Sequence, residues 1–396
     1  MNKRQTNIFI LAMVLIISVS FIFYFYNKAK QGSLFFESSD TKFNHANYQQ
    51  KDINNQDITS GRQNIITETV KNVSPTVVGI NVIEIRQYRD PFSSFFDDPF
   101  FRQFFGDRGN YNQKVKGLGS GFIISPDGYI LTNDHVAGNA SEITITMTNG
   151  KHYDAKVVGS DPVSDICLLK IDEDELPYVT LGNSDDIIIG EWVIALGNPF
   201  GLFELNDKPT VTVGVISATG MNLEPLENRY YLNMLQTDAA INGGNSGGPL
   251  VNSVGEVIGM NTLIYTGGVS QGNIGLSFAI PVNKLKRILT ELKQNGKIER
   301  DFDIGLRIQS LDEKIAEYYG LSTSRGVIIT QVASGFPAAK AGLKVGDIIL
   351  EVEDYKINNE QTLVGVFQEF RTGQTIALKI VRDDEILTKK MTLEKR

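Results

Sequence analysis

The stretch Ile-Asn-Gly-Gly-Asn-Ser-Gly-Gly-Pro-Leu, residues 241–250, surrounds one serine with glycines and ends in an apolar residue. Glycine tolerates positive φ angles, and asparagine and serine bond to nearby backbone, so one interpretation is a tight turn. The other makes Ser246 a nucleophile, because the glycines leave room for a substrate and free backbone N–H groups for a developing oxyanion. A serine hydroxyl is a weak nucleophile, so this second interpretation requires a base that a third group orients.

The chain contains three histidines, which are the natural candidates for that base near neutral pH. His45 lies in a polar stretch rich in Asn and Gln, which is typical of a linker. His152 follows Asn-Gly-Lys at 149–151, a hairpin-turn signal, so we expect it to face solvent. His135 follows the apolar, strand-like run 129–131, and the end of a strand can present a base rigidly. His135 is therefore the predicted base.

Asp165 is the candidate for the orienting acid. It precedes the apolar run 166–169, and this segment alone allows either an orienting carboxylate or a turn or cap residue. The chain order His135, Asp165, Ser246 favours the first, because it is the order of chymotrypsin-like proteases. The α/β-hydrolases have the order Ser, Asp, His.

The sequence around these residues resembles the HtrA/Deg family of serine proteases. The matching segments are GLGSGFII (117–124), TNDHV (132–136), VGSDP (158–162), SDICLLK (164–170), ALGNPFG (195–201), GVISATG (214–220), QTDAAINGGNSGGPL (236–250) and FAIP (278–281). The resemblance implies that His135, Asp165 and Ser246 form a catalytic triad. It also implies that the backbone N–H groups of Gly244 and Ser246 form the oxyanion hole.

Substrate preference follows from the same resemblance. Ile241 and Ile264 would line the S1 pocket, and Ala240 stands where trypsin-like enzymes carry an acid. We therefore expect an apolar pocket and cleavage after Val, Ala, Ile or similar residues.

A second module follows the protease segment. Apolar residues recur at helical spacing over 282–292, and the stretch 294–297 ends that pattern, which indicates a domain boundary. Beyond it, the segments DIGL (303–306), GVIITQV (326–332), AGLKVGD (341–347) and QTIALKIVR (374–382) resemble one PDZ domain. The implied fold is mainly β: a chymotrypsin-like double six-stranded β-barrel protease domain at 61–297, followed by a small α+β PDZ domain at 298–396.

A PDZ domain binds a peptide as an added strand and holds its terminal carboxylate on exposed N–H groups. The resemblance places this carboxylate loop at Ile304, Gly305 and Leu306. Asp303 stands where the family commonly has an aromatic residue, and an acid there should repel the carboxylate unless it points away. A PDZ domain that serves assembly is the alternative.

The N-terminal segment 8–26 contains nineteen residues without a charge, which is long enough to span a bilayer. We expect 1–27 to be a transmembrane anchor, with a cleaved signal peptide as the rival interpretation. Residues 28–60 are polar and are typical of a tether. The family resemblance places the catalytic part outside the cytoplasm, on a single-pass anchor in a bacterial inner membrane and facing the periplasm or the cell exterior.

Seven phenylalanines fall between residues 92 and 105, within the segment 90–113. Three interpretations stay open: a satellite hydrophobic cluster or mobile loop, the long regulatory loop of the HtrA/Deg family, and contact with a membrane surface.

Composition excludes several other classes. A net charge of −8 argues against nucleic-acid binding, and the sequence carries no P-loop or zinc-ligand pattern, so we expect no cofactor and no metal. The single Cys167 excludes an intramolecular disulfide and is interpreted as a small buried hydrophobe.

The expected function is an ATP-independent envelope endoprotease, forming a homotrimer, whose partners are misfolded or regulatory proteins and C-terminal peptides. The alternative is a proteolytically silent, membrane-tethered PDZ binding or chaperone protein.

Overall fold

The computed structural model describes residues 13, 16–24, 26–27, 62–88, 111–204, 207–226, 228–264, 275–320 and 324–395. The chain divides into two compact units, Met1–Arg62 and Gln63–Arg396. The described residues of the first unit are helical at 16–24 and 26–27. His45, the tether at 28–60 and most of the Phe-rich segment 90–113 lie outside the described residues. Among the described residues, no helix combines the length and the apolar character that crossing a membrane requires.

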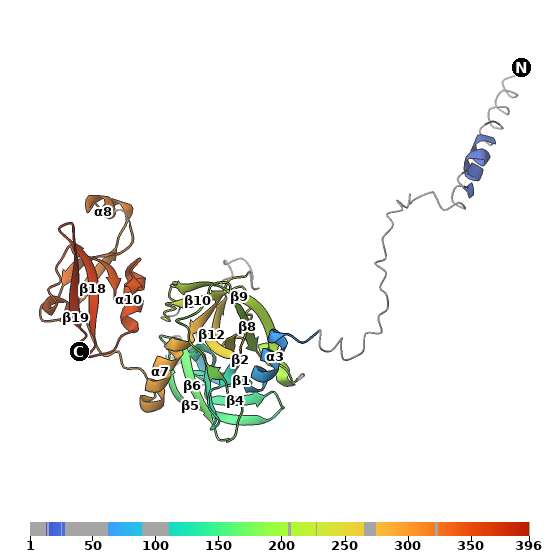
Figure 1. Ribbon diagram of the computed structural model, residues 1–396, viewed down its shortest axis with the longest axis horizontal. Helices are drawn as coiled ribbons and strands as arrows, with labels where there is room; N and C mark the ends of the chain where they lie inside the picture. Colours follow the sequence, from blue (N-terminus) through green and yellow to red (C-terminus); the bar gives the residue numbers. More distant parts are fainter. Residues whose placement is uncertain are drawn as a thin grey trace, which may run out of the picture. The chain divides into compact units, whose positions relative to one another are not determined.

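The second unit begins with the helix α3 (Ile65–Val73) and a closed six-stranded barrel in the order β1-β2-β3-β6-β5-β4 (Figure 1). Its strands are β1 (Val77–Tyr88), β2 (Tyr111–Ile123), β3 (Tyr129–Thr132), β4 (Glu142–Met147), β5 (His152–Asp161) and β6 (Ile166–Ile171). A turn joins β4 to β5 at Gly150, whose φ of 77° suits glycine. The predicted hairpin is therefore confirmed, and His152 begins β5 as an exposed residue.

A second barrel closes because β11 pairs with both β8 and β12 at the ends of the order β11-β8-β9-β10-β13-β12. Its strands are β8 (Trp192–Gly197), β9 (Thr210–Met221), β10 (Met234–Thr237), β11 (Pro249–Asn252), β12 (Glu256–Ile264) and β13 (Ser277–Pro281), with β7 (Thr180–Leu181) added beside β12. The predicted double six-stranded barrel is thus confirmed. Ser246 lies in the loop between β10 and β11.

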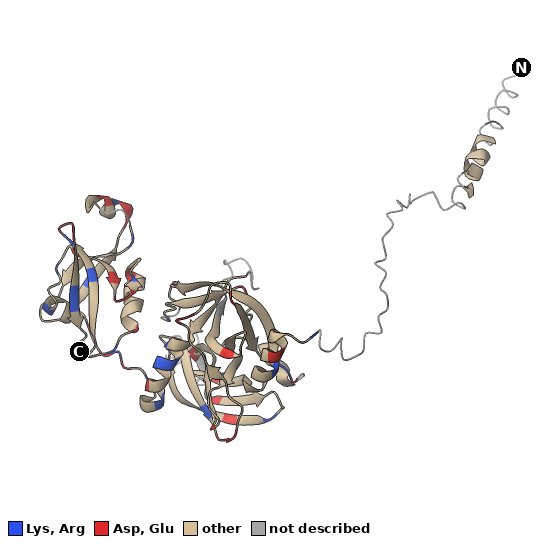
Figure 2. Cartoon of the chain, viewed as in Figure 1, with Lys and Arg blue, Asp and Glu red and all other residues tan. Residues whose placement is uncertain are grey.

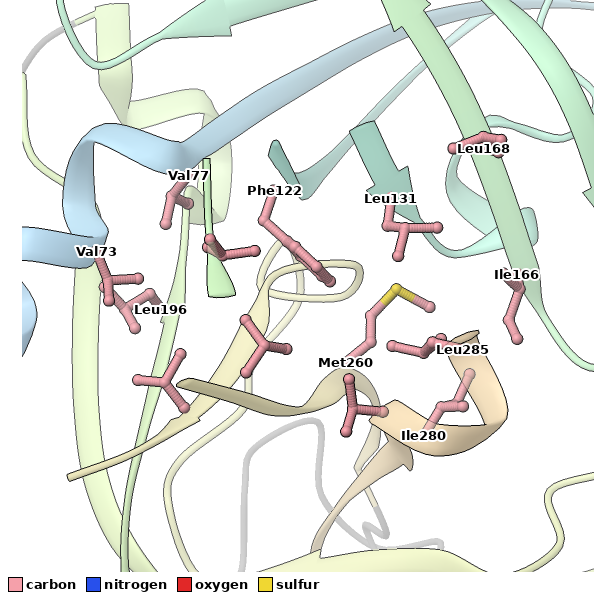
Figure 3. Packing of buried hydrophobic residues seen from close by; sticks show 14 of the residues in the cluster. Val73, Val77, Phe122, Leu131, Ile166, Leu168, Leu196, Met260, Ile280 and Leu285 are labelled. Atoms are coloured by element: carbon pink, nitrogen blue, oxygen red, sulfur yellow. The ribbon is translucent and has the colours of Figure 1, made fainter. Parts of the chain in front are cut away.

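Apolar side chains from both barrels form one continuous core. Figure 3 shows Phe122 and Leu131 of the first barrel pointing toward Met260 of the second. All three side chains have no exposed surface. This shared core fixes the relative positions of the strand ends that carry the candidate site residues.

Helix α7 (Val282–Asn295) follows β13 and packs its apolar face on that core. It ends at Gly296, which adopts a left-handed φ of 71°. This end confirms the predicted stop of the helical pattern.

The C-terminal module contains a six-stranded sheet in the order β14-β15-β16-β18-β19, with β17 beside β16. Its elements are β14 (Leu306–Ser310), α8 (Glu313–Tyr318), β15 (Val327–Val332), α9 (Pro337–Lys340), β16 (Ile348–Val352), β17 (Tyr355–Lys356), α10 (Glu360–Gln368), β18 (Thr375–Arg382) and β19 (Glu385–Thr392). It buries its own apolar cluster. The strand β14 is at the edge of the sheet, which leaves one side of its backbone available for an added strand.

Acidic and basic residues are both scattered over the described chain (Figure 2).

Candidate active site

His135 lies in the short helix α6 (Asp134–Ala137), directly after β3. Its ring atom Nδ1 is 2.8 Å from Oδ2 and 3.0 Å from Oδ1 of Asp165. Its backbone N–H also donates to Oδ1 of Asp165, at 2.9 Å. The carboxylate therefore holds both the ring and the backbone of the predicted base.

Asp165 is completely buried and has a positive φ of 59°, which is a strained conformation for a residue with a side chain. The amide of Asn133 donates to its backbone carbonyl at 3.0 Å. The hydroxyls of Thr262 and Tyr231 donate to its Oδ2 at 2.9 Å and 3.2 Å. Burial opposes ionisation of the Asp165 carboxyl, but the hydrogen bonds from His135 and Thr262 outweigh it and hold its pKa below the ordinary value.

Two glycines beside Ser246 have positive φ angles, 94° at Gly244 and 85° at Gly247. A Cβ atom at Gly247 would lie 2.2 Å from the carbonyl oxygen of Ser120, so a side chain does not fit there. The glycines are therefore required by backbone geometry and by close packing against the first barrel.

The hydroxyl of Ser246 donates to the carbonyl oxygen of Thr262 at 3.2 Å. Among the described residues, no hydrogen bond joins it to His135. Both side chains nevertheless line the same cavity of about 350 Å³, together with Gly243 and Gly244. A bond from this hydroxyl to the imidazole would therefore replace its bond to the Thr262 carbonyl.

Ser120 links the Ser246 loop to both barrels, and sequence reasoning assigned it no role. Its backbone N–H donates to the carbonyl of Ser246 at 2.9 Å, and its hydroxyl donates to the carbonyl of Gly244 at 2.5 Å. The same hydroxyl accepts from the N–H of Asn198 at 2.7 Å. Within the described residues, the N–H groups of Gly244 and Ser246 donate no hydrogen bond, so both are free for an oxyanion.

Of the two residues predicted to form the S1 pocket, only Ile241 has a described side chain. Ile241 is 1 % exposed and packs in the apolar cluster of the second barrel. The side chain of Ile264 lies outside the described residues. Cys167 is fully buried, as predicted, and burial raises the pKa of its thiol to about 12.

The predicted peptide site of the C-terminal module is a groove of about 310 Å³ between β14 and α10. Its apolar lining includes Ile304, Leu306 and Phe367. Asp303 lines the groove as well, and its carboxylate accepts from the N–H of Gly305 at 2.9 Å. One of the three backbone donors predicted for a peptide carboxylate is therefore already used by this chain's own acid.

Among the described residues, no group of three or more His, Cys, Asp or Glu side chains is arranged to hold a metal ion.

Comparison with known proteins identifies two domains in this chain. Residues 119–260 match the trypsin-like peptidase domain, and residues 302–393 match the PDZ domain. The fold and the site together define a chymotrypsin-like serine peptidase.

Relatives of high similarity carry the name "Probable periplasmic serine endoprotease DegP-like". The one from Hahella chejuensis is 42 % identical over 80 % of this chain and 67 % of its own length. The one from Marinomonas sp. is 42 % identical over 83 % of this chain and 71 % of its own length. The relative from Chlamydia trachomatis is also 42 % identical to this chain, but the match covers only 59 % of that relative's length.

Solved structures are similar over most of the chain. "HtrA-type protease AlgW with decapeptide" has a TM-score of 0.61 and 36 % identity, and covers 83 % of this chain and 98 % of that one. The serine endoprotease from Yersinia pestis has a TM-score of 0.54 and 31 % identity, and covers 84 % of this chain and 98 % of that one. The chain belongs to the HtrA family of DegP-like serine endoproteases with a PDZ domain.

Replacing Ser120 tests whether its hydroxyl holds the Ser246 loop in the conformation that catalysis requires. Ser120→Ala removes the hydroxyl that joins the Gly244 carbonyl to Asn198, so the peptide between Gly244 and Asn245, which separates the two predicted oxyanion donors, loses this restraint. We expect kcat for an apolar peptide amide to fall about tenfold with little change in KM, because an oxyanion is present only in the transition state. Ser141→Ala, at an exposed position, is the matched control. A Ser120→Ala protein with the wild-type kcat would contradict this assignment.

Proposed function

We propose that this chain is an ATP-independent serine endoprotease of the cell envelope that cleaves misfolded or regulatory proteins after small apolar residues. The observation that carries the proposal is the contact of His135 Nδ1 with buried Asp165, at 2.8 Å, on the cavity that Ser246 also lines. The periplasmic location named for its relatives supports placement of the catalytic part in the periplasm.

The proposed reaction uses these three side chains as one unit. Ser246 attacks the carbonyl carbon of a peptide, and His135 accepts the hydroxyl proton and returns it to the leaving amine. Asp165 accepts from Nδ1, which leaves Nε2 as the basic nitrogen, and it stabilises the imidazolium that forms. Water then hydrolyses the acyl-enzyme with the same histidine as base.

The N–H groups of Gly244 and Ser246 would stabilise the oxyanion of the tetrahedral intermediate. Their support is that neither donates elsewhere within the described residues and that Ser120 bonds to the Gly244 carbonyl, in the peptide between the two donors. We assign Ile241 and Ile264 to the apolar wall of the S1 pocket on the family resemblance, with Ala240 in place of the acid of trypsin-like enzymes.

Serine-dependent degradation tests this function directly. The full chain in detergent should degrade an unfolded protein, and Ser246→Ala should reduce the rate by several orders of magnitude, because the triad acts as a unit. Mass spectrometry of the fragments should place the cuts after Val, Ala or Ile. The alternative function, a silent binding or chaperone protein, predicts no degradation by the folded wild-type chain. Cuts after Arg or Lys would reject the S1 assignment alone.

The PDZ groove is proposed to bind peptides and to regulate the protease. Its support is the open edge of β14 beside an apolar groove, together with structural relatives that carry bound peptides. For a C-terminal peptide, the donors would come from Ile304, Gly305 and Leu306. Asp303 opposes such a ligand by its charge and by its bond to the N–H of Gly305.

Neutralising Asp303 tests whether its charge weakens the binding of a C-terminal peptide. Asp303→Asn keeps an acceptor for the N–H of Gly305 but removes the charge, so an apolar peptide with a free carboxylate should bind about fivefold more tightly, equivalent to about 1 kcal/mol. The same peptide with an amidated C-terminus should gain nothing. Asp301→Asn, outside the groove lining, is the matched control. Equal affinities of wild type and Asp303→Asn for the free-acid peptide would contradict the prediction.

Membrane attachment through residues 8–26 is proposed on the length of the uncharged segment. Extraction of the full chain from membranes should then require detergent. Release by alkaline carbonate alone would reject an anchor.

A homotrimer is proposed on the family resemblance, and an exposed apolar patch supports it. The patch consists of Ile188, Ile189 and Trp192, which are 69 %, 62 % and 57 % exposed. Adjacent large apolar side chains with this exposure usually contact another protein.

Trp192→Ala should shift the light-scattering mass of the full chain from three copies toward one at micromolar concentration, since buried tryptophans often dominate interface energies. Tyr178→Ala, at another exposed aromatic residue, is the control. A trimer of unchanged stability in Trp192→Ala would exclude the patch as the interface, and a monomeric wild type would exclude the trimer.

A further inference from the structure

Arg229 connects two acidic side chains beside the predicted base. Its guanidinium atom Nη2 is 3.1 Å from Oδ2 of Asp134, and its Nε is 3.4 Å from Oδ1 of Asp165. The Arg229 side chain is 13 % exposed, and the two carboxylates are 3 % and 0 % exposed. The contacts are therefore shielded from water, where charge interactions are stronger than at the surface.

The two carboxylates belong to residues that precede and follow His135 in the chain, and Arg229 contacts both. Asp134 directly precedes His135 in α6, and the hydroxyl of Ser160 donates to its Oδ1 at 2.5 Å. Asp165 receives the ring N–H of His135. Two buried acids at one imidazole would stabilise the imidazolium and oppose each other's ionisation. The Arg229 guanidinium offsets one of these negative charges.

We propose that Arg229 is a positioning residue of the proteolytic site. Its guanidinium forms an ion pair with Asp165 and a hydrogen-bonded ion pair with Asp134, so that the imidazole faces one uncompensated carboxylate rather than two. This role rests on the proposed triad.

The segment that carries Arg229 is held from two sides. The Tyr231 hydroxyl donates to Asp165, whereas Leu232 is 2 % exposed within the apolar cluster of the PDZ module. The Tyr230 N–H donates to the carbonyl of Val163 at 2.9 Å. The consecutive residues Tyr231 and Leu232 thus pack toward Asp165 and toward the PDZ core, which restrains the backbone from which the guanidinium reaches the carboxylates.

Other charged groups near His135 do not replace Arg229. Glu84 of β1 and Lys116 of β2 line the cavity that His135 shares with Ser246, and they have opposite charges. On the buried side, the charged or titratable groups around the two carboxylates are Asp134, Asp165, Arg229, Tyr231 and the Cys167 thiol, whose pKa burial raises. Arg229 is the only cation among these described groups.

Arg229→Met tests the proposal through the pH dependence of kcat/KM on an apolar peptide amide. The acid limb should move to higher pH by about one unit, because removal of a cation from two nearby carboxylates favours the imidazolium. KM should change less than twofold, since Arg229 does not line the cavity. Arg229→Lys keeps the positive charge, so its acid limb should lie close to that of the wild type. Arg307→Met, at an exposed position of β14, is the matched control.

A second readout does not depend on turnover. Imidazole NMR of the full chain, with resonances assigned by His45→Gln and His152→Gln, follows protonation of His135 in wild type and in Arg229→Met. The midpoint should rise in Arg229→Met by the same amount as the kinetic limb. If instead hydrolysis proves independent of Ser246 while the NMR midpoint shifts, the proposed function fails and the charge role of Arg229 stands.

Two results would overturn the proposal. One is a folded Arg229→Met chain with the wild-type acid limb and midpoint. The other is an equal loss of activity in Arg229→Met and Arg229→Lys without a pH shift, which would mark Arg229 as a structural residue only. Circular dichroism establishes that each variant is folded.

Discussion

The site depends on the burial of one carboxylate, that of Asp165. Taking a charge out of water is strongly unfavourable unless hydrogen bonds and opposite charge replace the lost hydration. Here His135, Thr262 and Tyr231 supply those hydrogen bonds, and Arg229 supplies the opposite charge. Because these partners come from different parts of both barrels, the carboxylate is satisfied only when the barrels are packed together.

The strain at Asp165 fits this view. A positive φ at a residue with a side chain persists only where the surroundings determine it, and the Asn133 amide holds the Asp165 carbonyl. The Ser246 loop is held in a similar way, since Ser120 of the first barrel bonds to the backbone of the loop from the second. The packing of the two barrels therefore fixes the position of Asp165 relative to the Ser246 loop, and neither loop does so alone.

Much of this was predictable from sequence. Of the three histidines, only one lay at a strand end, and chain order selected Asp165 as the acid. A turn signal at 149–151 predicted the hairpin at Gly150, and apolar residues at helical spacing predicted helix α7. The partners of Asp165 were not predictable, because Tyr231 and Thr262 are 66 and 97 residues away and ordinary in type. Local pattern reveals which residues can do chemistry, whereas the groups that satisfy a buried charge are selected by tertiary packing.

In the PDZ groove, too, the sequence predicted the residues but not their contacts. Its loop was located by motif, and Asp303 was recognised as unusual, but only the structure shows that its carboxylate caps the N–H of Gly305. An i to i+2 contact of this kind is common for aspartate in turns, so residue type alone could not distinguish it from an outward-pointing side chain.

The central claim, that His135 and Asp165 activate Ser246, is tested most directly by stoichiometric labelling with a fluorophosphonate, which reacts with an activated serine. Peptide mapping of the labelled full chain should place one phosphonyl group on Ser246, and His135→Ala should abolish the labelling. Labelling of Ser246 at the same rate in His135→Ala, or none in the folded wild-type chain, would contradict the account.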